Sequence, residues 1–209
     1  MTQPASAAGA PAAEAPAPPK PQMELAAIQT VAIIGAGTAG RSFALAVACA
    51  GFHAILEDVM PANLRKAEAD FADMGDRVSQ GRLSLATTVE DAVRDADLAI
   101  DFVPDELESK LEIFSMIDRM APPRTILCTP TYALSITDLA SCVYRPERSF
   151  ALRGPLTAPS AETLHLLYPT AAAEAPLSAT AAFLQTMGFQ VATQPDPDVP
   201  MLVKNLPPS

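Results

Sequence analysis

The sequence predicts an α/β fold in which helices cover both faces of a doubly wound, mostly parallel sheet. From residue 30 onward, short apolar runs alternate with segments of helical period, which is the pattern that such sheets produce. Apolar residues make up 49% of the chain, and 209 residues are enough for one ordinary domain with a core. We therefore expect a single domain over residues 29–209, preceded by a separate arm over residues 1–28.

Each element is predicted from its own apolar pattern. The first strand is a continuous apolar run, VAII, which suits a strand buried on both faces. The first helix carries Phe43 and Val47 on one face, and Pro61 opens the second helix. The expected strands cover residues 31–34, 54–56, 98–103, 126–128, 150–152, 164–167 and 190–193. The expected helices cover residues 39–50, a segment from 61, residues 107–120, a short helix at a capping box over 135–138, and one that ends at 188.

The N-terminal arm and the charge balance restrict the possible partners. Residues 1–22 are an Ala/Pro tract without the basic start and apolar stretch of a secretory signal, so we expect a disordered arm. Twenty-four acidic residues against fourteen basic ones give a formal charge of −10. This balance argues against nucleic acid or an anionic membrane surface, because both require a concentrated positive face. No segment has the roughly 18 consecutive apolar residues of a membrane span.

The cysteines indicate a reducing compartment. Cys49, Cys128 and Cys142 are odd in number, widely spaced and set in apolar surroundings. We expect buried thiols that form neither a disulfide framework nor a set of metal ligands. We expect a soluble, cytoplasmic protein without a metal site.

A glycine-rich turn follows the first strand and opens the first helix. It matches G-x-G-x-x-G and consists of Gly35, Ala36, Gly37, Thr38, Ala39 and Gly40. In this context, Gly35 permits the tight turn, Gly37 lets the backbone approach a pyrophosphate, and Gly40 lets helix and strand pack closely. The helix N-terminus then offers N–H groups and partial positive charge to the phosphates. The alternative is a structural glycine turn in an ordinary α/β domain.

An acidic residue at the end of the second strand completes the Rossmann signature. Asp58 lies 23 residues after Gly35, where a carboxylate accepts the hydroxyl protons of the adenosine ribose. A 2′-phosphate would meet Glu57 and Asp58, with no arginine before Arg65. The sequence therefore predicts NAD rather than NADP as the cofactor. The alternative for Asp58 is an ordinary surface charge.

Five segments with fixed order and spacing go beyond this general signature. They cover residues 31–40, 95–100, 103–114, 123–139 and 145–148. Together they resemble successive motifs of the 3-hydroxyacyl-CoA dehydrogenase family, and the resemblance extends over residues 28–205. It implies that Asp105 and Lys110 contact the nicotinamide half of NAD. From the residues alone, Asp105 also suits a solvated helix start.

The same resemblance shows that most catalytic positions are substituted. In that family, a histidine moves the hydroxyl proton, and a glutamate orients that histidine. A serine and an asparagine hold the substrate carbonyl. The resemblance places Tyr132 at the serine, Arg153 at the histidine and His165 at the glutamate. Leu156 takes the place of the asparagine in the histidine motif, whereas a later asparagine is kept as Asn205.

These substitutions leave three functional interpretations open. Arg153 does not deprotonate, so the first is an NAD-binding protein that is not a competent hydroxyacyl-CoA dehydrogenase on its own: a sensor, a regulatory subunit or a partner-dependent subunit. The second is a rewired NAD-dependent oxidoreductase. There, Tyr132, Arg153 and His165 surround one pocket and act on a small hydroxy acid or an acyl-CoA. The third is a non-catalytic interaction protein that uses the Ala/Pro arm.

Two larger departures from the family favour a partner. The stretch between Asp58 and Asp95 is short for the family's helical hairpin, and the chain stops at Ser209, where the family's helical C-terminal domain begins. We expect a homo-oligomer or a protein partner in place of that domain. The alternative for His165 is a strand residue packed among leucines, and that for Arg153 is a solvated charge.

Overall fold

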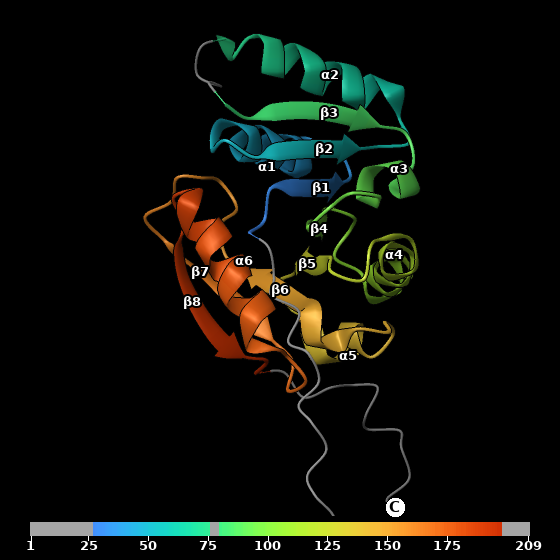
Figure 1. Ribbon diagram of the computed structural model, residues 1–209, viewed down its shortest axis with the longest axis vertical. Helices are drawn as coiled ribbons and strands as arrows, with labels where there is room; N and C mark the ends of the chain where they lie inside the picture. The colour runs from blue at the N-terminus through green and yellow to red at the C-terminus, as the bar shows by residue number, and fades with distance from the viewer. Residues whose placement is uncertain (1–26, 76–79, 198–209) are drawn as a thin grey trace, which may run out of the picture.

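Eight strands form one sheet in the computed structural model, which describes residues 27–75 and 80–197 (Figure 1). The strand order is β3-β2-β1-β4-β5-β6-β7-β8. Neighbouring strands are parallel except for β6 and β7, which are antiparallel. The strands are β1 (Thr30–Ile34), β2 (His53–Glu57), β3 (Arg82–Ala86), β4 (Leu98–Asp101), β5 (Ile126–Pro130), β6 (Ser149–Arg153), β7 (Thr163–Tyr168) and β8 (Gln190–Pro195). The predicted mostly parallel α/β sheet is thus confirmed.

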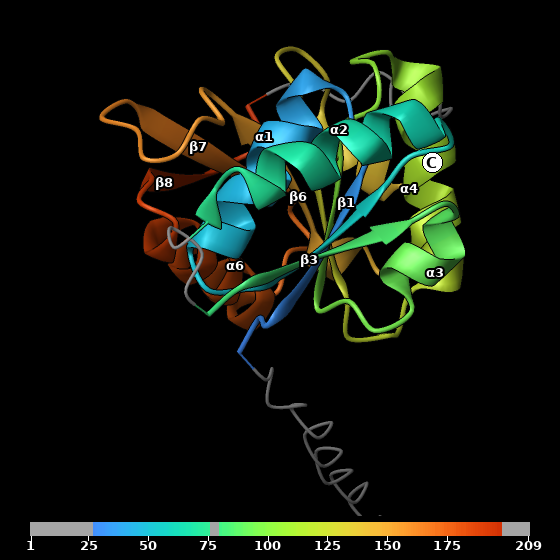
Figure 2. The same ribbon diagram turned by 90° about the horizontal axis from the view of Figure 1, so that it is seen from above.

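Helices cover both faces of this sheet. They are α1 (Thr38–Cys49), α2 (Pro61–Ala72), α3 (Val89–Val93), α4 (Leu107–Met120), α5 (Ile136–Ala140) and α6 (Glu174–Thr186), with a 3₁₀ turn, η2 (Pro146–Arg148). One core contains Phe43 of α1 and Phe183 of α6, and the other contains Phe114 of α4 and Leu139 of α5. Figures 1 and 2 show α6 and α4 on opposite sides of the sheet.

Strand alternation produces these two cores. In β4, Leu98 and Ile100 belong to the core under α1 and α6, whereas Ala99 belongs to the core under α4. Because β1 lies between β2 and β4, the chain reverses the direction in which the sheet grows at this point. Ligands of open α/β sheets bind at the carboxyl ends of the strands beside such a switch point.

Local sequence signals explain several boundaries. Pro61 lies in the first turn of α2, as predicted. Ser135 caps α5 by accepting a hydrogen bond from the N–H of Asp138, which is the N-cap half of the predicted capping box. The predicted strand over 98–103 is too long, since β4 ends at Asp101 and the next two residues lead into a loop. The elements β3, α3 and η2 were not predicted.

The predicted arm lies almost wholly outside the described residues. Ile28, at its expected end, is buried in the core with 5% of its surface exposed. Across the described ranges, no helix has the length and apolar character required to cross a membrane.

Candidate cofactor site

The glycine-rich turn connects β1 to α1 at the switch point. Gly35 has a φ of +101°, which favours glycine, and a Cβ at Gly40 would collide with the carbonyl oxygen of Gly35. A Cβ at Gly37, in contrast, would meet no atom within 4 Å. The first and third glycines are therefore required by the fold, whereas the second leaves open space beside the N-terminus of α1. This open space fits the close backbone approach that a pyrophosphate requires.

Asp58 follows β2 and is held beside this turn. Its Oδ2 accepts hydrogen bonds from the N–H of Ala36 at 2.8 Å and from the side-chain amide of Asn63 at 3.1 Å. Its Oδ1 accepts one from the N–H of Met60 at 2.7 Å. Although burial opposes ionisation, these three donors lower the pKa of Asp58 below its ordinary value. Asp58 is thus a fixed carboxylate that also ties the glycine turn to the start of α2.

Glu57 adds a second acidic group at the end of β2. It is buried, with 4% of its surface exposed. Burial and the charge of Asp58 raise the pKa of Glu57 to about 6. At neutral pH, two carboxylates therefore lie where a 2′-phosphate would approach, which agrees with the expected preference for NAD.

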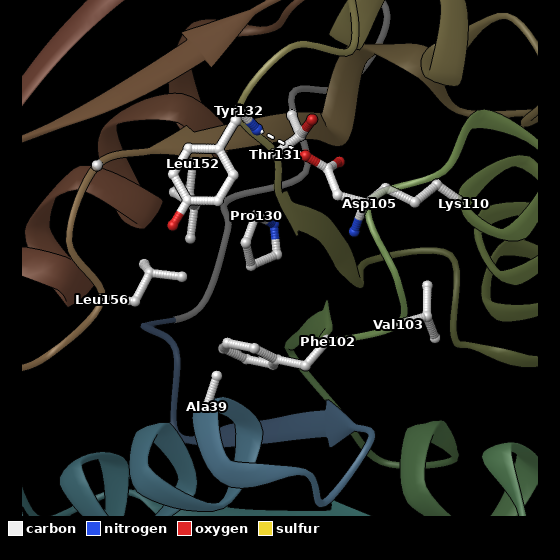
Figure 3. Close-up of a pocket in the computed structure, with 11 residues that line it drawn as sticks. Ala39, Phe102, Val103, Asp105, Lys110, Pro130, Thr131, Tyr132, Leu152 and Leu156 are labelled. Carbon is white, nitrogen blue, oxygen red and sulfur yellow. Dashed lines mark hydrogen bonds between the residues drawn. The ribbon is translucent and has the colours of Figure 1, made fainter.

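A pocket of about 200 Å³ opens at the carboxyl ends of β4, β5 and β6 (Figure 3). It is lined by Ala39, Phe102, Val103, Asp105, Lys110, Pro130, Thr131, Tyr132, Leu152, Gly154 and Leu156. Figure 3 shows Tyr132 across the pocket from Ala39 and Phe102. The lining is mostly apolar, and Tyr132 is 80% exposed.

The two polar residues expected at the nicotinamide half both line this pocket. Asp105 accepts a hydrogen bond from the N–H of Tyr132 at 2.8 Å and so connects the loops that follow β4 and β5. Lys110 reaches the pocket from α4 and forms a buried ion pair with Asp101, with 2.8 Å between Nζ and Oδ1. Its Nζ also donates to Oγ1 of Thr129 at 2.9 Å.

The interpretation as a rewired oxidoreductase depends on Tyr132, Arg153 and His165. Tyr132 lines the pocket, but Arg153 and His165 are not among its lining residues. These two residues pair across β6 and β7. Arg153 donates to the backbone carbonyls of Thr131 at 3.4 Å and Leu134 at 3.2 Å. This pocket therefore gives no support to the prediction that all three side chains surround one site, and that arrangement stays a prediction.

The remaining expected positions have different outcomes. Leu156 lines the pocket as an apolar group in place of the family's asparagine. Asn205 lies outside the described residues. Among the described residues, no cluster of three or more His, Cys, Asp and Glu side chains could hold a metal ion.

Sequence reasoning missed three residues that support the site. Asn63 braces Asp58, while Asp101 and Thr129 hold Lys110. A signal was present for Asp101, because a carboxylate at the end of the apolar run LAID requires a partner when it is buried. The partner is Lys110, nine residues later, which the sequence analysis assigns to the cofactor and not to Asp101.

The switch point, the open second glycine and the fixed carboxylate define a dinucleotide-binding Rossmann domain. The family described as "3-hydroxyacyl-CoA dehydrogenase, NAD binding domain" matches residues 30–191. The chain therefore belongs to the 3-hydroxyacyl-CoA dehydrogenase family, and its cofactor is NAD.

Relatives with assigned names agree with this family. The chain is 29% identical over 174 residues to a probable 3-hydroxybutyryl-CoA dehydrogenase of Bacillus subtilis, covering 77% of this chain and 60% of that protein. It is 30% identical over 184 residues to a 3-hydroxybutyryl-CoA dehydrogenase of Bradyrhizobium diazoefficiens, covering 82% and 62%. The solved structure of 3-hydroxybutyryl-CoA dehydrogenase from Escherichia coli K12 superposes with a TM-score of 0.72 at 28% identity, covering 81% of this chain and 38% of that one. The chain thus spans about three fifths of the length of the first two relatives.

Proposed function

We propose that this chain binds NAD(H) and does not oxidise 3-hydroxyacyl-CoA on its own, so that it works as a sensor, a regulatory subunit or a partner-dependent subunit. The observation that carries the proposal is the position of Arg153. By its resemblance to the family, Arg153 corresponds to the catalytic histidine, and its guanidinium donates to two backbone carbonyls and is not among the residues that line the pocket.

The lining of the pocket supports the loss of acid–base chemistry. Its side chains that titrate are Asp105, Lys110 and Tyr132. Asp105 accepts a backbone N–H, and Lys110 is held by Asp101. Without a proton acceptor aimed at a substrate hydroxyl, the reaction loses about 10²–10⁴-fold in rate.

The cofactor half of the site is intact by comparison. The residues that would hold NAD are the turn around Gly37, with Asp58 at the adenosine ribose, and Asp105 and Lys110 at the nicotinamide half. NAD supplies hydride transfer when it is bound. The chain supplies the open approach at Gly37 and a carboxylate that three hydrogen bonds orient.

A rewired oxidoreductase for a small hydroxy acid is less well supported. That function requires the Arg153 guanidinium to grip a carboxylate in the pocket, but its N–H groups serve the loop after β5. An acyl-CoA ligand fits the mostly apolar lining better than a small anion does. Completion of the site by a second copy or by another protein belongs to the same proposal.

A calorimetric titration with NADH and NADPH tests cofactor binding. Substitution of Asp58 is a poor probe, because this residue also anchors the glycine turn and α2. Gly37→Ala is sharper, since its methyl group meets no protein atom but fills the approach to the phosphates. We expect unchanged thermal stability and at least about tenfold weaker NADH binding, or about 1.4 kcal/mol. Gly40→Ala is the matched control for a glycine that the fold requires, and we expect it to lower the melting temperature.

The catalytic part of the proposal is tested by incubating the chain alone with 3-hydroxybutyryl-CoA and NAD and recording NADH absorbance. We expect NADH binding without turnover. Turnover that Tyr132→Phe abolishes would establish the rewired enzyme instead. Failure of either nucleotide to bind would refute the proposal altogether.

A further inference from the structure

Three polar side chains are buried together between α4 and the sheet, from three different elements. Asp101 at the end of β4 is 0% exposed, Lys110 of α4 is 1% exposed, and Thr129 of β5 is 0% exposed. The Lys110 Nζ lies 2.8 Å from Oδ1 of Asp101 and 2.9 Å from Oγ1 of Thr129. The charged groups of Lys110 and Asp101 are therefore almost wholly removed from water.

The stability of the fold is a weak reason for such a pair. Removing two charges from water costs several kcal/mol each, and well-packed apolar residues often replace a buried pair without loss of stability. Oδ2 of Asp101 is buried and has no hydrogen-bond partner among the described residues, so the carboxylate is not fully compensated. Because packing alone does not explain this cost, we looked to the pocket for the role of the buried pair.

The position of Lys110 relative to the pocket supplies that role. Lys110 lines the pocket, whereas Asp101 and Thr129 do not. An ammonium group has three N–H donors, of which the described partners take two. The third N–H remains for a ligand at the same wall of the pocket as Asp105.

We infer that Asp101 is a positioning residue that, with Thr129, fixes the Lys110 ammonium so that the nicotinamide group of bound NAD meets a preset hydrogen-bond donor. This inference rests on the proposed binding of NAD(H). A lysine side chain has four rotatable bonds, and fixing it before the ligand arrives reduces the ordering cost of binding. The adenosine half, held at Gly37 and Asp58 beyond β1, does not depend on this group.

The test compares NADH with ADP-ribose, which has the adenosine half and both phosphates but no nicotinamide. Calorimetric titrations of the full chain give the ratio of the two dissociation constants. For Asp101→Asn, we expect NADH binding to weaken by about tenfold and ADP-ribose binding to change by less than about twofold. A role in folding alone would weaken both ligands together.

A second variant keeps the inference testable if Asp101→Asn does not fold. Thr129→Val removes one hydrogen bond from the Lys110 ammonium at nearly constant volume, so we expect about threefold weaker NADH binding with ADP-ribose unchanged. Equal affinity of the unmodified chain for NADH and ADP-ribose would overturn the inference, as would an unchanged ratio in the folded variants. Binding of neither ligand by the unmodified chain would refute the proposed function, and the inference with it.

Discussion

Glu57→Gln is the substitution for which the structure gives the most quantitative prediction. The pKa of Glu57 is raised from 4.5 to about 6 by burial and by the charge of Asp58. The folded state therefore opposes ionisation of this carboxyl group. Below about pH 4.5 the group is protonated in both the folded and the unfolded state, and it costs no stability. As the pH rises through 6, the folded state acquires an unfavourable buried charge, and the free energy of unfolding falls.

The magnitude follows from the difference between the two pKa values. One pKa unit corresponds to 1.36 kcal/mol, so the full difference sets a ceiling of about 2 kcal/mol. Glutamine keeps a polar amide at this buried position, so the substitution recovers only part of this ceiling. We therefore expect Glu57→Gln to stabilise the fold by about 1 kcal/mol at pH 7.5 and by nothing measurable at pH 4.5.

Urea unfolding at several pH values between 4.5 and 7.5 measures this effect. Glu68→Gln is the matched control, because Glu68 lies on the exposed face of α2 and makes the same change in net charge. The reasoning fails if Glu57→Gln stabilises the fold equally at both ends of the pH range. It also fails if the control reproduces the whole effect, since the gain would then come from net charge.

Three further predictions concern other parts of the fold. The expectation of buried thiols is correct for Cys128 and wrong for Cys49, which is exposed. A thiol reagent should therefore modify Cys49 quickly in the native protein and leave Cys128 untouched, because burial and a nearby carboxylate raise the pKa of Cys128. Mass spectrometry before and after denaturation measures this. Asp118→Asn should lower the free energy of unfolding by about 3 kcal/mol, because Asp118 is 1% exposed and pairs with Arg145 at 2.8 Å; a loss below about 1 kcal/mol in urea unfolding would contradict this. Arg153→Met should cost about 1 kcal/mol and speed hydrogen exchange in the loop after β5, with NADH affinity unchanged; slower exchange or weaker NADH binding would count against a role in supporting that loop.

The sequence allowed much of the fold to be predicted because its strongest signals are local. Continuous apolar runs and helical spacing located β1 and α4, and a capping box located α5. The strand β3 was not predicted because RLSLA is short, interrupts its apolar residues with Arg82 and Ser84, and lies on the edge of the sheet, where little of it is buried. The five-residue helix α3 is too short to show a helical period, although Thr88 and Asp91 form a cap at its start.

The candidate site also contains parts that the sequence predicts and parts that it does not. The glycine turn and Asp58 were predictable, because each glycine has its own steric reason and the acid follows at a fixed distance. The direction of the Arg153 side chain was not predictable from the sequence. It depends on the face of β6 on which the residue lies, where β6 pairs with the antiparallel strand β7. Leu152 faces the pocket, so the next residue along the strand faces away from it.

The predictable and the unpredictable parts of the site differ in whether backbone or side chains build them. The cofactor half of the site is built largely from backbone, namely a positive φ at Gly35, open space at Gly37 and N–H groups that fix Asp58. A substitution there disturbs the fold itself. Arg153, in contrast, is a side chain at the end of a strand, and it holds the loop after β5 through two backbone carbonyls. The proposed function, NAD binding without proton transfer, therefore requires changes only in side chains and none in the backbone that forms the cofactor half.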